Sequence, residues 1–390
     1  MSGTIAASRR PRVVYWNYMP APYMVDRFNA LARRGHIDFE AWFNARREPH
    51  WSGAWEINEH DWEFGYRYIP SHMIRGRTLG FPPALLSRRL PDVLISPHGE
   101  PSFVLGWCAA RLRGIRTAFW VVRTFDSWTP RIGYKEALKR RMLPRADAIL
   151  VPGPDAETFA RSYGASSDRI MRIHHPINVD FIALGPTPPV ERESIRRRYG
   201  LVGTTFIYVG RLWWGKGLGY LLDAFSSVQR SGRAVSLLIV GDGPEEGALR
   251  DRCRAEGLRV IITGFKQKHE LPAYYRASDA FVFPTLGDPF GLVIGEAMAC
   301  ALPVVATTAA GEIRERVEHG INGLLVPPAN SIALAAAMRE LSDDPARMRA
   351  MGLVSAERVK GHTPDRWAAE LEHAIGRILT VPSVREVSRL

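Results

Sequence analysis

The chain has 390 residues, of which 46% are hydrophobic and 24% charged, so it is long enough for two globular domains and too apolar to be disordered. Three scattered cysteines argue against a disulfide framework, and no apolar run is long enough to cross a membrane. The formal net charge of +12 predicts attraction to phosphates, in nucleic acid, anionic lipid or a small substrate. The N-terminus lacks the apolar segment of a secretory signal, so we expect a cytoplasmic protein.

In the first half of the chain, short β-branched or aromatic runs alternate with helical patterns, which is typical of parallel sheets flanked by helices. Strands are expected at residues 13–16, 37–43, 93–96, 117–122, 148–151 and 170–173. Helices are expected at residues 24–33, 103–113 and 134–143. Residues 46–70 are rich in aromatic and charged side chains but have no clear periodicity.

A stretch rich in proline and charge, residues 182–203, predicts a linker between domains. The alternation then restarts, with strands expected at 206–209, 237–240, 259–262, 280–283 and 304–306. Helices are expected to begin at Leu218 and Pro244, and to occupy residues 270–277 and 292–301. The two blocks predict an α/β protein of two facing, doubly wound Rossmann-like domains, residues 1–181 and 204–363, with a ligand cleft at the carboxyl ends of the strands. An apolar stripe predicts a last helix over residues 364–380.

One expected helix concentrates positive charge. Its basic residues are Arg131, Lys135, Lys139, Arg140, Arg141 and Arg145, against the single acid Glu136. Leu138, Met142 and Leu143 lie among them, so the segment is a candidate for lying on an anionic membrane surface. The alternative is a solvated helix face. No zinc finger or aromatic RNA-binding signature accompanies the charge, and we expect no nucleic-acid partner.

A glycine-bearing loop follows the strand at 206–209 and reads Gly210-Arg211-Leu-Trp-Trp-Gly-Lys216-Gly217. Glycines let the backbone approach a ligand closely, and two cations five residues apart suit a diphosphate. The alternative is an exposed turn with two solvated cations.

Two further patterns are weaker. Gly241-Asp-Gly243-Pro-Glu-Glu-Gly247 imitates a dinucleotide-binding fingerprint, but its last glycine comes one residue late. His98 ends a strand on the side where a substrate is expected, although a lone histidine there is more often structural.

Two carboxylates, Asp288 and Glu296, lie eight residues apart, one in a loop and one on the helix behind it. The amides of Phe290, Gly291 and Leu292 would be free donors at the start of that helix, suited to anions or sugar hydroxyls. Because carboxylates accept hydrogen bonds from neighbouring hydroxyls, this arrangement favours a polyhydroxyl ligand. The alternative is two surface acids at a helix start.

Together these motifs resemble the retaining glycosyltransferases of family 4, which have the GT-B fold of two facing Rossmann-like domains. The resemblance covers most of the second half and, more loosely, the first. Its strongest parts are Gly210-Arg211 with Lys216-Gly217, Val240-Gly241-Asp-Gly-Pro, Gly264-Phe265, Ser278-Asp279-Ala with Pro284, and Asp288-Pro-Phe-Gly291 with Glu296-Ala-Met-Ala.

The resemblance implies a role for each motif residue. Arg211 and Lys216, in the loop that starts at Gly210, would hold the diphosphate of the donor. Glu296 would bind the ribose hydroxyls. Asp288, one methylene shorter than the glutamate usual in the family, would contact the donor sugar. The remaining donor contacts would come from Gly264 and Phe265 against the base and from the amides of Phe290, Gly291 and Leu292 on the sugar.

The first half departs from the family pattern. His98 fits one of the two histidines that members often carry at strand ends, but Arg123 stands where the second is expected. Arg123 and the nearby Asp126 are candidates for contacts on the acceptor or sugar side.

The resemblance implies a hexosyltransferase that uses a UDP- or GDP-linked sugar, needs no metal or other cofactor, and retains the anomeric configuration. Its acceptor would be a hydroxyl of a glycan, a lipid-linked sugar or a small molecule, in the synthesis of envelope polysaccharide or glycoconjugate. The basic helix 131–145 and the net charge favour a cytoplasmic protein in peripheral contact with the inner membrane face, and the alternative is a soluble acceptor. Two alternatives are a catalytically silent nucleotide-sugar-binding subunit with the same fold and a nicotinamide-dependent oxidoreductase.

Overall fold

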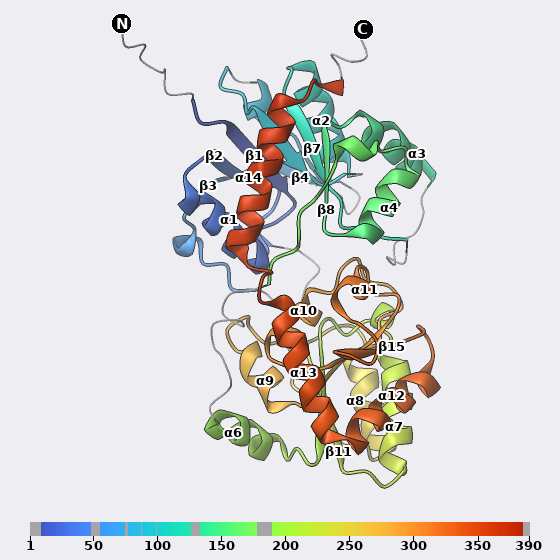
Figure 1. Ribbon diagram of the computed structural model, residues 1–390. Coiled ribbons are helices and arrows are strands. Elements are labelled where there is room, and N and C mark those ends of the chain that lie inside the picture. The colour runs from blue at the N-terminus through green and yellow to red at the C-terminus, as the bar shows by residue number, and fades with distance from the viewer. Residues whose placement is uncertain are drawn as a thin grey trace, which may run out of the picture.

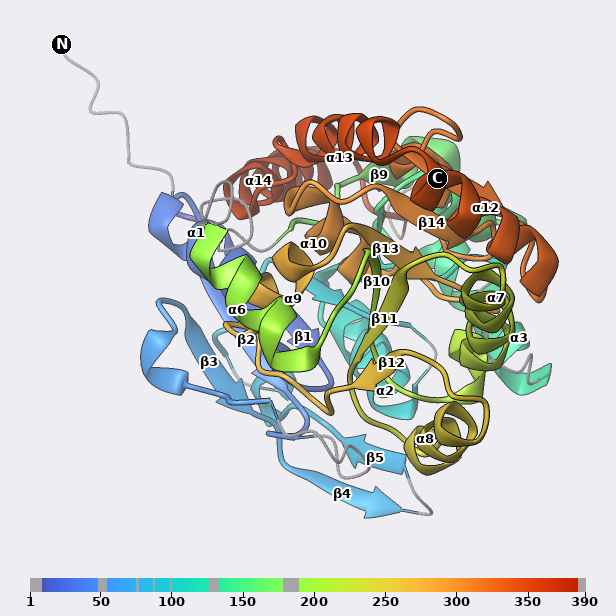
Figure 2. The same ribbon diagram turned by 90° about the horizontal axis from the view of Figure 1, so that it is seen from below.

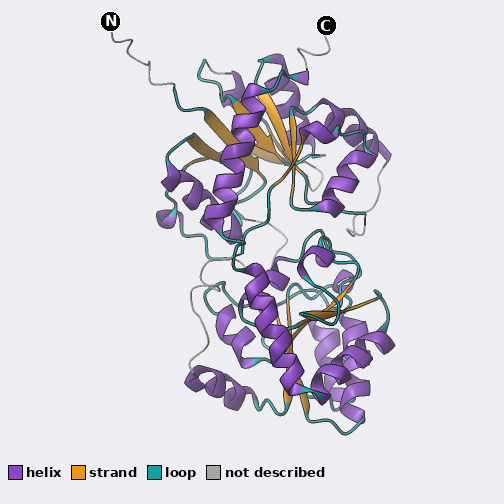
Figure 3. Cartoon of the chain, in the orientation of Figure 1, coloured by secondary structure: helices purple, strands orange, loops and turns teal. Residues whose placement is uncertain are grey.

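The computed structural model describes residues 9–47, 55–74, 77–86, 88–98, 100–125, 133–177 and 189–384. It consists of two α/β units, each built on one parallel sheet, which lie one above the other in Figure 1. Helices pack on both faces of each sheet (Figure 3). The predicted fold class, two facing doubly wound domains, is confirmed.

The first sheet contains β1 (Arg12–Asn17), β2 (Asp38–Phe43), β3 (Gly65–Tyr68), β6 (Val93–Ser96), β7 (Arg116–Trp120), β8 (Ala148–Val151) and β9 (Ile170–Arg172). All neighbours are parallel, in the order β3-β2-β1-β6-β7-β8-β9. Its helices are α1 (Pro22–Arg34), α2 (Pro101–Leu112), α3 (Gly133–Met142) and α4 (Pro154–Ser162). A separate antiparallel hairpin is formed by β4 (Ser71–Ile74) and β5 (Arg77–Gly80).

The second sheet contains β10 (Thr204–Val209), β11 (Val235–Val240), β12 (Val260–Ile262), β13 (Ala280–Phe283), β14 (Val304–Thr307) and β15 (Gly323–Val326). Their order is β12-β11-β10-β13-β14-β15, so the direction of winding reverses between β10 and β13. Such a reversal opens a crevice for ligands at the carboxyl ends of the strands. The helices of this unit are α6 (Pro189–Tyr199), α7 (Leu218–Arg230), α8 (Glu246–Ala255), α9 (Leu271–Ala277), α10 (Leu292–Ala299), α11 (Ile313–Arg316), α12 (Ser331–Asp343) and α13 (Pro345–Val359), and the last helix of the chain is α14 (Pro364–Thr380). Helix α8 begins two residues after Pro244, where the sequence predicted its start.

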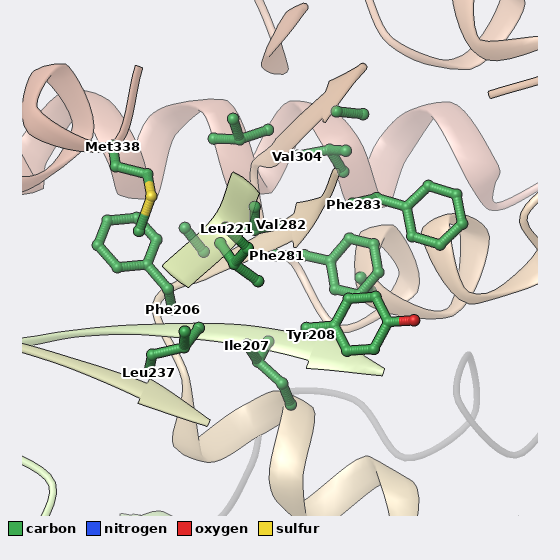
Figure 4. Packing of buried hydrophobic residues seen from close by; sticks show 14 of the residues in the cluster. Phe206, Ile207, Tyr208, Leu221, Leu237, Phe281, Val282, Phe283, Val304 and Met338 are labelled. Atoms are coloured by element: carbon green, nitrogen blue, oxygen red, sulfur yellow. The ribbon is translucent and has the colours of Figure 1, made fainter. Parts of the chain in front are cut away.

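The second sheet is buried on both faces, and its strands are therefore almost continuously apolar. Every residue of β11 is buried, as is every residue of β10 after the first. Figure 4 shows side chains of β10 and β13 packed with Leu221 of α7 and Met338 of α12. This packing fixes the strand ends from which the loops of the site extend.

The chain crosses between the units near its end, where α13 packs on the second unit and α14 on the first (Figures 1 and 2). Trp367 of α14 is completely buried in the core next to α1, and Glu372 forms an ion pair with Arg34 at 2.7 Å. The amide of Ile177 donates to the carbonyl of His362 at 2.7 Å, so the two interdomain segments are in contact.

Helix α3 carries the basic segment, but its apolar side chains face inward. The residues that pack in the core of the first unit are Leu138, Met142 and Leu143. Lys139 is buried as well, and its Nζ donates to Glu136 Oε1 at 2.5 Å. Arg131 lies outside the described residues. The apolar residues that we had placed on a membrane-facing surface therefore belong to the core. Among the described residues, no helix combines the length and the apolar composition needed to span a bilayer.

Candidate active site

A cavity of about 280 Å³ lies between the two units, at the carboxyl ends of β10 and β11. Its wall on the first unit includes Pro22, Tyr23 and Trp55. The predicted site residues that line it from the second unit are Gly210, Arg211, Phe265, Leu292 and Glu296. The structure therefore brings together residues from three separate motifs of the second half of the chain.

The glycine-bearing loop after β10 packs tightly on the loop after β13. Gly217 has a left-handed backbone (φ 69°), and a Cβ there would lie only 2.1 Å from a carbonyl oxygen of the loop after β13. The amide of Leu286 donates to the carbonyl of Gly215 at 2.9 Å. This close approach brings Lys216 to Asp288, which is 72 residues further along the chain.

Lys216 Nζ forms an ion pair with Asp288 Oδ2, and both side chains are largely buried. The other carboxylate oxygen of Asp288 accepts a hydrogen bond from the amide of Phe290 at 2.9 Å. Burial acts to raise the pKa of Asp288, but the Lys216 cation and these hydrogen bonds outweigh it, so the pKa lies below its usual value. Asp288 is therefore ionised, and the charge of Lys216 is neutralised within the protein.

The start of α10 is held in place by Arg316, a residue that the sequence analysis did not select. Its guanidinium is buried, lies 4.2 Å from the ring centroid of Phe290, and donates to the carbonyls of Phe290 and Gly291, the latter at 2.9 Å. Gly291 itself has φ 66°. The amides of Phe290 and Gly291, predicted as free donors, both interact with the carboxylate of Asp288, so of the three predicted donors Leu292 is the one left for a ligand.

Glu296 lies on the second turn of α10 and faces the cavity. Burial raises its pKa to about 7, although a hydrogen bond from the hydroxyl of Tyr275, at 3.0 Å, acts in the opposite direction. At neutral pH this side chain is thus present in both protonation states, and in either state it can accept a hydrogen bond from a hydroxyl group.

Glu312 joins the two units, and the sequence analysis missed this residue as well. Its carboxylate accepts hydrogen bonds from the amides of Asp155 and Ala156 at the start of α4, at 3.1 and 2.8 Å. In return, the amide of Glu312 donates to Asp155 Oδ2 at 3.0 Å. Glu312 is 1% exposed and has an unusual backbone for a non-glycine residue (φ 54°). A helix start on one unit is therefore capped by a carboxylate from the other.

On the first unit, His98 and Arg123 follow the neighbouring strands β6 and β7. Burial, followed by the Arg123 cation, lowers the pKa of His98 to about 3, so its imidazole is neutral. Next to Arg123, Thr124 approaches Gly311 of the second unit, where an added Cβ would lie 3.0 Å from Thr124 Cγ2. Asp126 lies outside the described residues.

Packing explains the first two glycines of the pattern, Gly241 and Gly243, whereas a Cβ on Gly247 would meet open space. A Cβ on Gly241 would lie 1.9 Å from the carbonyl oxygen of Gly210, and the amide of Gly241 donates to the carbonyl of Gly264 at 2.9 Å. The predicted base-binding segment, Gly264 and Phe265, is thereby joined to the predicted diphosphate loop. The lack of a side chain at these glycines allows the loops of the site to pack against each other.

Two family models match the chain. Residues 21–181 match the model described as Glycosyltransferase Family 4, and residues 203–344 match the one described as Glycosyl transferases group 1. Together the matches cover more than two thirds of the chain.

Curated proteins with similar sequences include Alpha-D-kanosaminyltransferase of Streptomyces kanamyceticus, at 36% identity over 211 residues, which are 53% of this chain and 54% of that protein. Another is the GDP-mannose-dependent alpha-(1-6)-phosphatidylinositol monomannoside mannosyltransferase of Mycolicibacterium smegmatis. It is 29% identical over 324 residues, which are 78% of this chain and 82% of that protein. The chain thus spans about half the length of the first of these relatives.

Among solved structures, Anabaena HepE in complex with UDP matches with a TM-score of 0.78, over 94% of this chain and 100% of that one. At 19% identity this likeness establishes the fold alone. The two family matches, in the same order along the chain as the two sheets, agree with it. The chain belongs to the glycosyltransferases that these two models describe, Glycosyltransferase Family 4 and Glycosyl transferases group 1, and has the GT-B fold.

Proposed function

We propose that the protein is a glycosyltransferase that moves a hexose from a nucleoside diphosphate sugar to an acceptor hydroxyl and retains the anomeric configuration. The observation that carries the proposal is the ion pair between Lys216 and Asp288, next to a loop whose Arg211 lines a cavity shared with Glu296. The loop that carries both cations thus contacts one carboxyl group, Asp288, and shares the cavity with the other, Glu296. One relative is named as GDP-mannose-dependent and a structural neighbour is a UDP complex, which supports a nucleotide-linked donor.

In this proposal Arg211 and Lys216 bind the diphosphate, and Lys216 exchanges its contact with Asp288 for one with phosphate. Asp288 is then available to accept a hydrogen bond from a hydroxyl of the donor sugar. Glu296 accepts hydrogen bonds from the ribose, and Phe265 lies against the base. As the bond between the sugar carbon and the diphosphate oxygen breaks, these cations and the amides of α10 stabilise the charge that develops on the leaving group. This neutralisation takes the place of a metal ion.

Retention follows if the acceptor attacks from the face that the diphosphate leaves. The acceptor oxygen forms the new bond to the sugar carbon, and its proton passes to the departing phosphate oxygen. This course requires no side-chain nucleophile and no covalent sugar–enzyme intermediate.

We propose an acceptor hydroxyl on a glycan, a lipid-linked sugar or a small molecule, in envelope polysaccharide or glycoconjugate synthesis in the cytoplasm. Contact with the inner membrane face would be electrostatic, because the apolar residues of α3 are internal while Arg140, Arg141 and Arg145 are exposed. Sedimentation with anionic liposomes at low and high salt tests this contact. Binding that salt abolishes is expected, and no binding at low salt would rule it out.

The donor is tested by thermal-shift measurements with UDP, GDP, ADP and their sugars, since a ligand that binds only the folded state raises the Tm. One nucleotide should raise it, and the matching sugar nucleotide should be hydrolysed slowly without an acceptor, with or without a chelator. Binding without any hydrolysis or transfer would instead support a catalytically silent subunit. Loss of turnover on chelation would refute neutralisation by protein groups alone.

A further inference from the structure

Arg123 is a half-buried cation that forms no ion pair with a carboxylate of the described residues. In the part of the chain that the structure describes, its guanidinium makes no hydrogen bond and no ion pair. The side chain is partly buried, and this burial lowers the pKa of its guanidinium. Removing a cation from water without a partner is unfavourable, so an arginine held in this way is suited to an anion that arrives with a ligand.

The carboxylates near Arg123 are already engaged. Glu136 accepts a hydrogen bond from Lys139 Nζ on one oxygen and from the hydroxyl of Tyr163 on the other. Glu100 forms an ion pair with Lys135 at 2.8 Å. These acids pair with other groups, and the charge of Arg123 remains available.

His98 adds a polar atom at the same place. Its Nδ1 is fully buried and has no hydrogen-bond partner within the described residues. It belongs to the strand next to that of Arg123, and the two side chains interact electrostatically. A neutral imidazole can donate one hydrogen bond to an anion without needing a counter-ion of its own.

The loop after β7, which carries Arg123, approaches the second unit. Its neighbour Thr124 approaches Gly311, and the amide of Gly311 donates to the carbonyl of Asp288 at 2.8 Å. Contacts between described residues thus lead from the end of β7 through Gly311 to the ion pair of Lys216 and Asp288. In the proposed function Asp288 contacts the donor sugar, so this chain of contacts would put a group bound at Arg123 on the same side of the cleft as that sugar.

We propose that Arg123 and His98 form an anion subsite on the first unit, which binds a phosphate or carboxylate group of a substrate. The inference rests on the proposed function, because the anion belongs either to the acceptor or to the diphosphate of the donor. An acceptor held there by its anionic group would present a neighbouring hydroxyl to the donor sugar, so the subsite would select anionic acceptors over neutral ones.

The test is calorimetric titration of inorganic phosphate into the full-length protein after saturation with the nucleoside diphosphate chosen by thermal shift. Saturation occupies the diphosphate loop, so the remaining phosphate binding reports a second site. The variants are Arg123→Gln and Arg123→Lys, with Arg141→Gln as control, because Arg141 is exposed on α3 and its loss changes net charge equally. Melting curves establish that each variant is folded.

Loss of a charge-assisted contact to phosphate should weaken the Kd for phosphate about 10- to 100-fold in Arg123→Gln, less in Arg123→Lys, and under about twofold in Arg141→Gln. If instead Arg123→Gln weakens nucleotide binding about tenfold and leaves phosphate binding unchanged, the anion is the diphosphate of the donor. If neither affinity differs from that of Arg141→Gln, the subsite is refuted. If no nucleotide binds at all, the proposed function fails, and the same titration without nucleotide still decides the subsite.

Discussion

The ion pair between Lys216 and Asp288 can be tested by a double-mutant cycle of Lys216→Met and Asp288→Asn. Their side chains are 17% and 12% exposed, so Lys216→Met leaves a buried carboxylate without its cation. Breaking a buried pair in this way costs about 3–5 kcal/mol. The cost is limited because Asp288 keeps the hydrogen bond from Phe290 and can take up a proton at about 1.4 kcal/mol per pKa unit. We expect the free energy of unfolding to fall by about 2–4 kcal/mol in Lys216→Met, and by about half of that or less in the double variant.

Nucleotide binding should respond in opposite directions to the two single substitutions. In the protein without donor, Lys216 is paired with Asp288, so a diphosphate must displace this contact. Asp288→Asn removes the competing carboxylate and should tighten the Kd for the nucleoside diphosphate about three- to tenfold, whereas Lys216→Met should weaken it at least about tenfold. Sugar transfer should fall in both variants.

Urea unfolding measures the stabilities, and calorimetry measures the affinities of the four proteins of the cycle. Two results would refute the reasoning. One is that the stability costs of the single variants add in the double variant to within about 0.5 kcal/mol, which means that the pair is not coupled. The other is that Asp288→Asn weakens nucleotide binding as much as Lys216→Met does.

Three further predictions concern residues around this pair. The folded state raises the pKa of Glu296 from 4.5 to about 7, so the unfolded state loses this proton first and stability falls as pH rises between these values. The loss is at most about 3 kcal/mol, and urea unfolding of Glu296→Gln should lack this decline. Glu312→Ala removes the carboxylate that caps α4 and joins the units. In this variant kcat/KM should fall about tenfold, and X-ray scattering should give a larger radius of gyration. The control Glu318→Ala, at an exposed position, should change neither quantity. Arg316→Met removes the hydrogen-bond donor to the carbonyls of Gly291 and Gly311. The free energy of unfolding, measured in urea, should fall by about 2–4 kcal/mol. An unchanged free energy would show that these contacts are dispensable.

Much of the fold could be predicted because buried parallel strands are short apolar runs that can be recognised in the sequence. The strands at 93–96, 148–151 and 280–283 were predicted with their observed bounds. Strand β3 was missed, since it lies at the sheet edge, is largely exposed and carries tyrosine and arginine instead of an apolar run. The start of α8 was misplaced because Pro244 resembles a first helical residue, although the chain makes a turn there before the helix begins.

The site was predictable where its chemistry is carried by short motifs. Arg211 and Glu296 were selected from local patterns, and both line the cavity. Glu312 and Arg316 were not, because their partners cannot be identified from nearby sequence. Glu312 binds amides 156 and 157 residues away, and Arg316 contacts carbonyls that any residue could supply. No spacing rule applies to contacts of this kind.

The residues that sequence reasoning missed also connect the two proposals. The carbonyl of Asp288 accepts the amide of Gly311, and Arg316 donates to the carbonyl of Gly311 at 3.0 Å. The next residue, Glu312, caps α4 on the first unit. The loop that contacts Asp288 is therefore also the loop that joins the two units. In the proposed function, a donor that separates Lys216 from Asp288 would act on a packed segment that also holds the two walls of the cleft together.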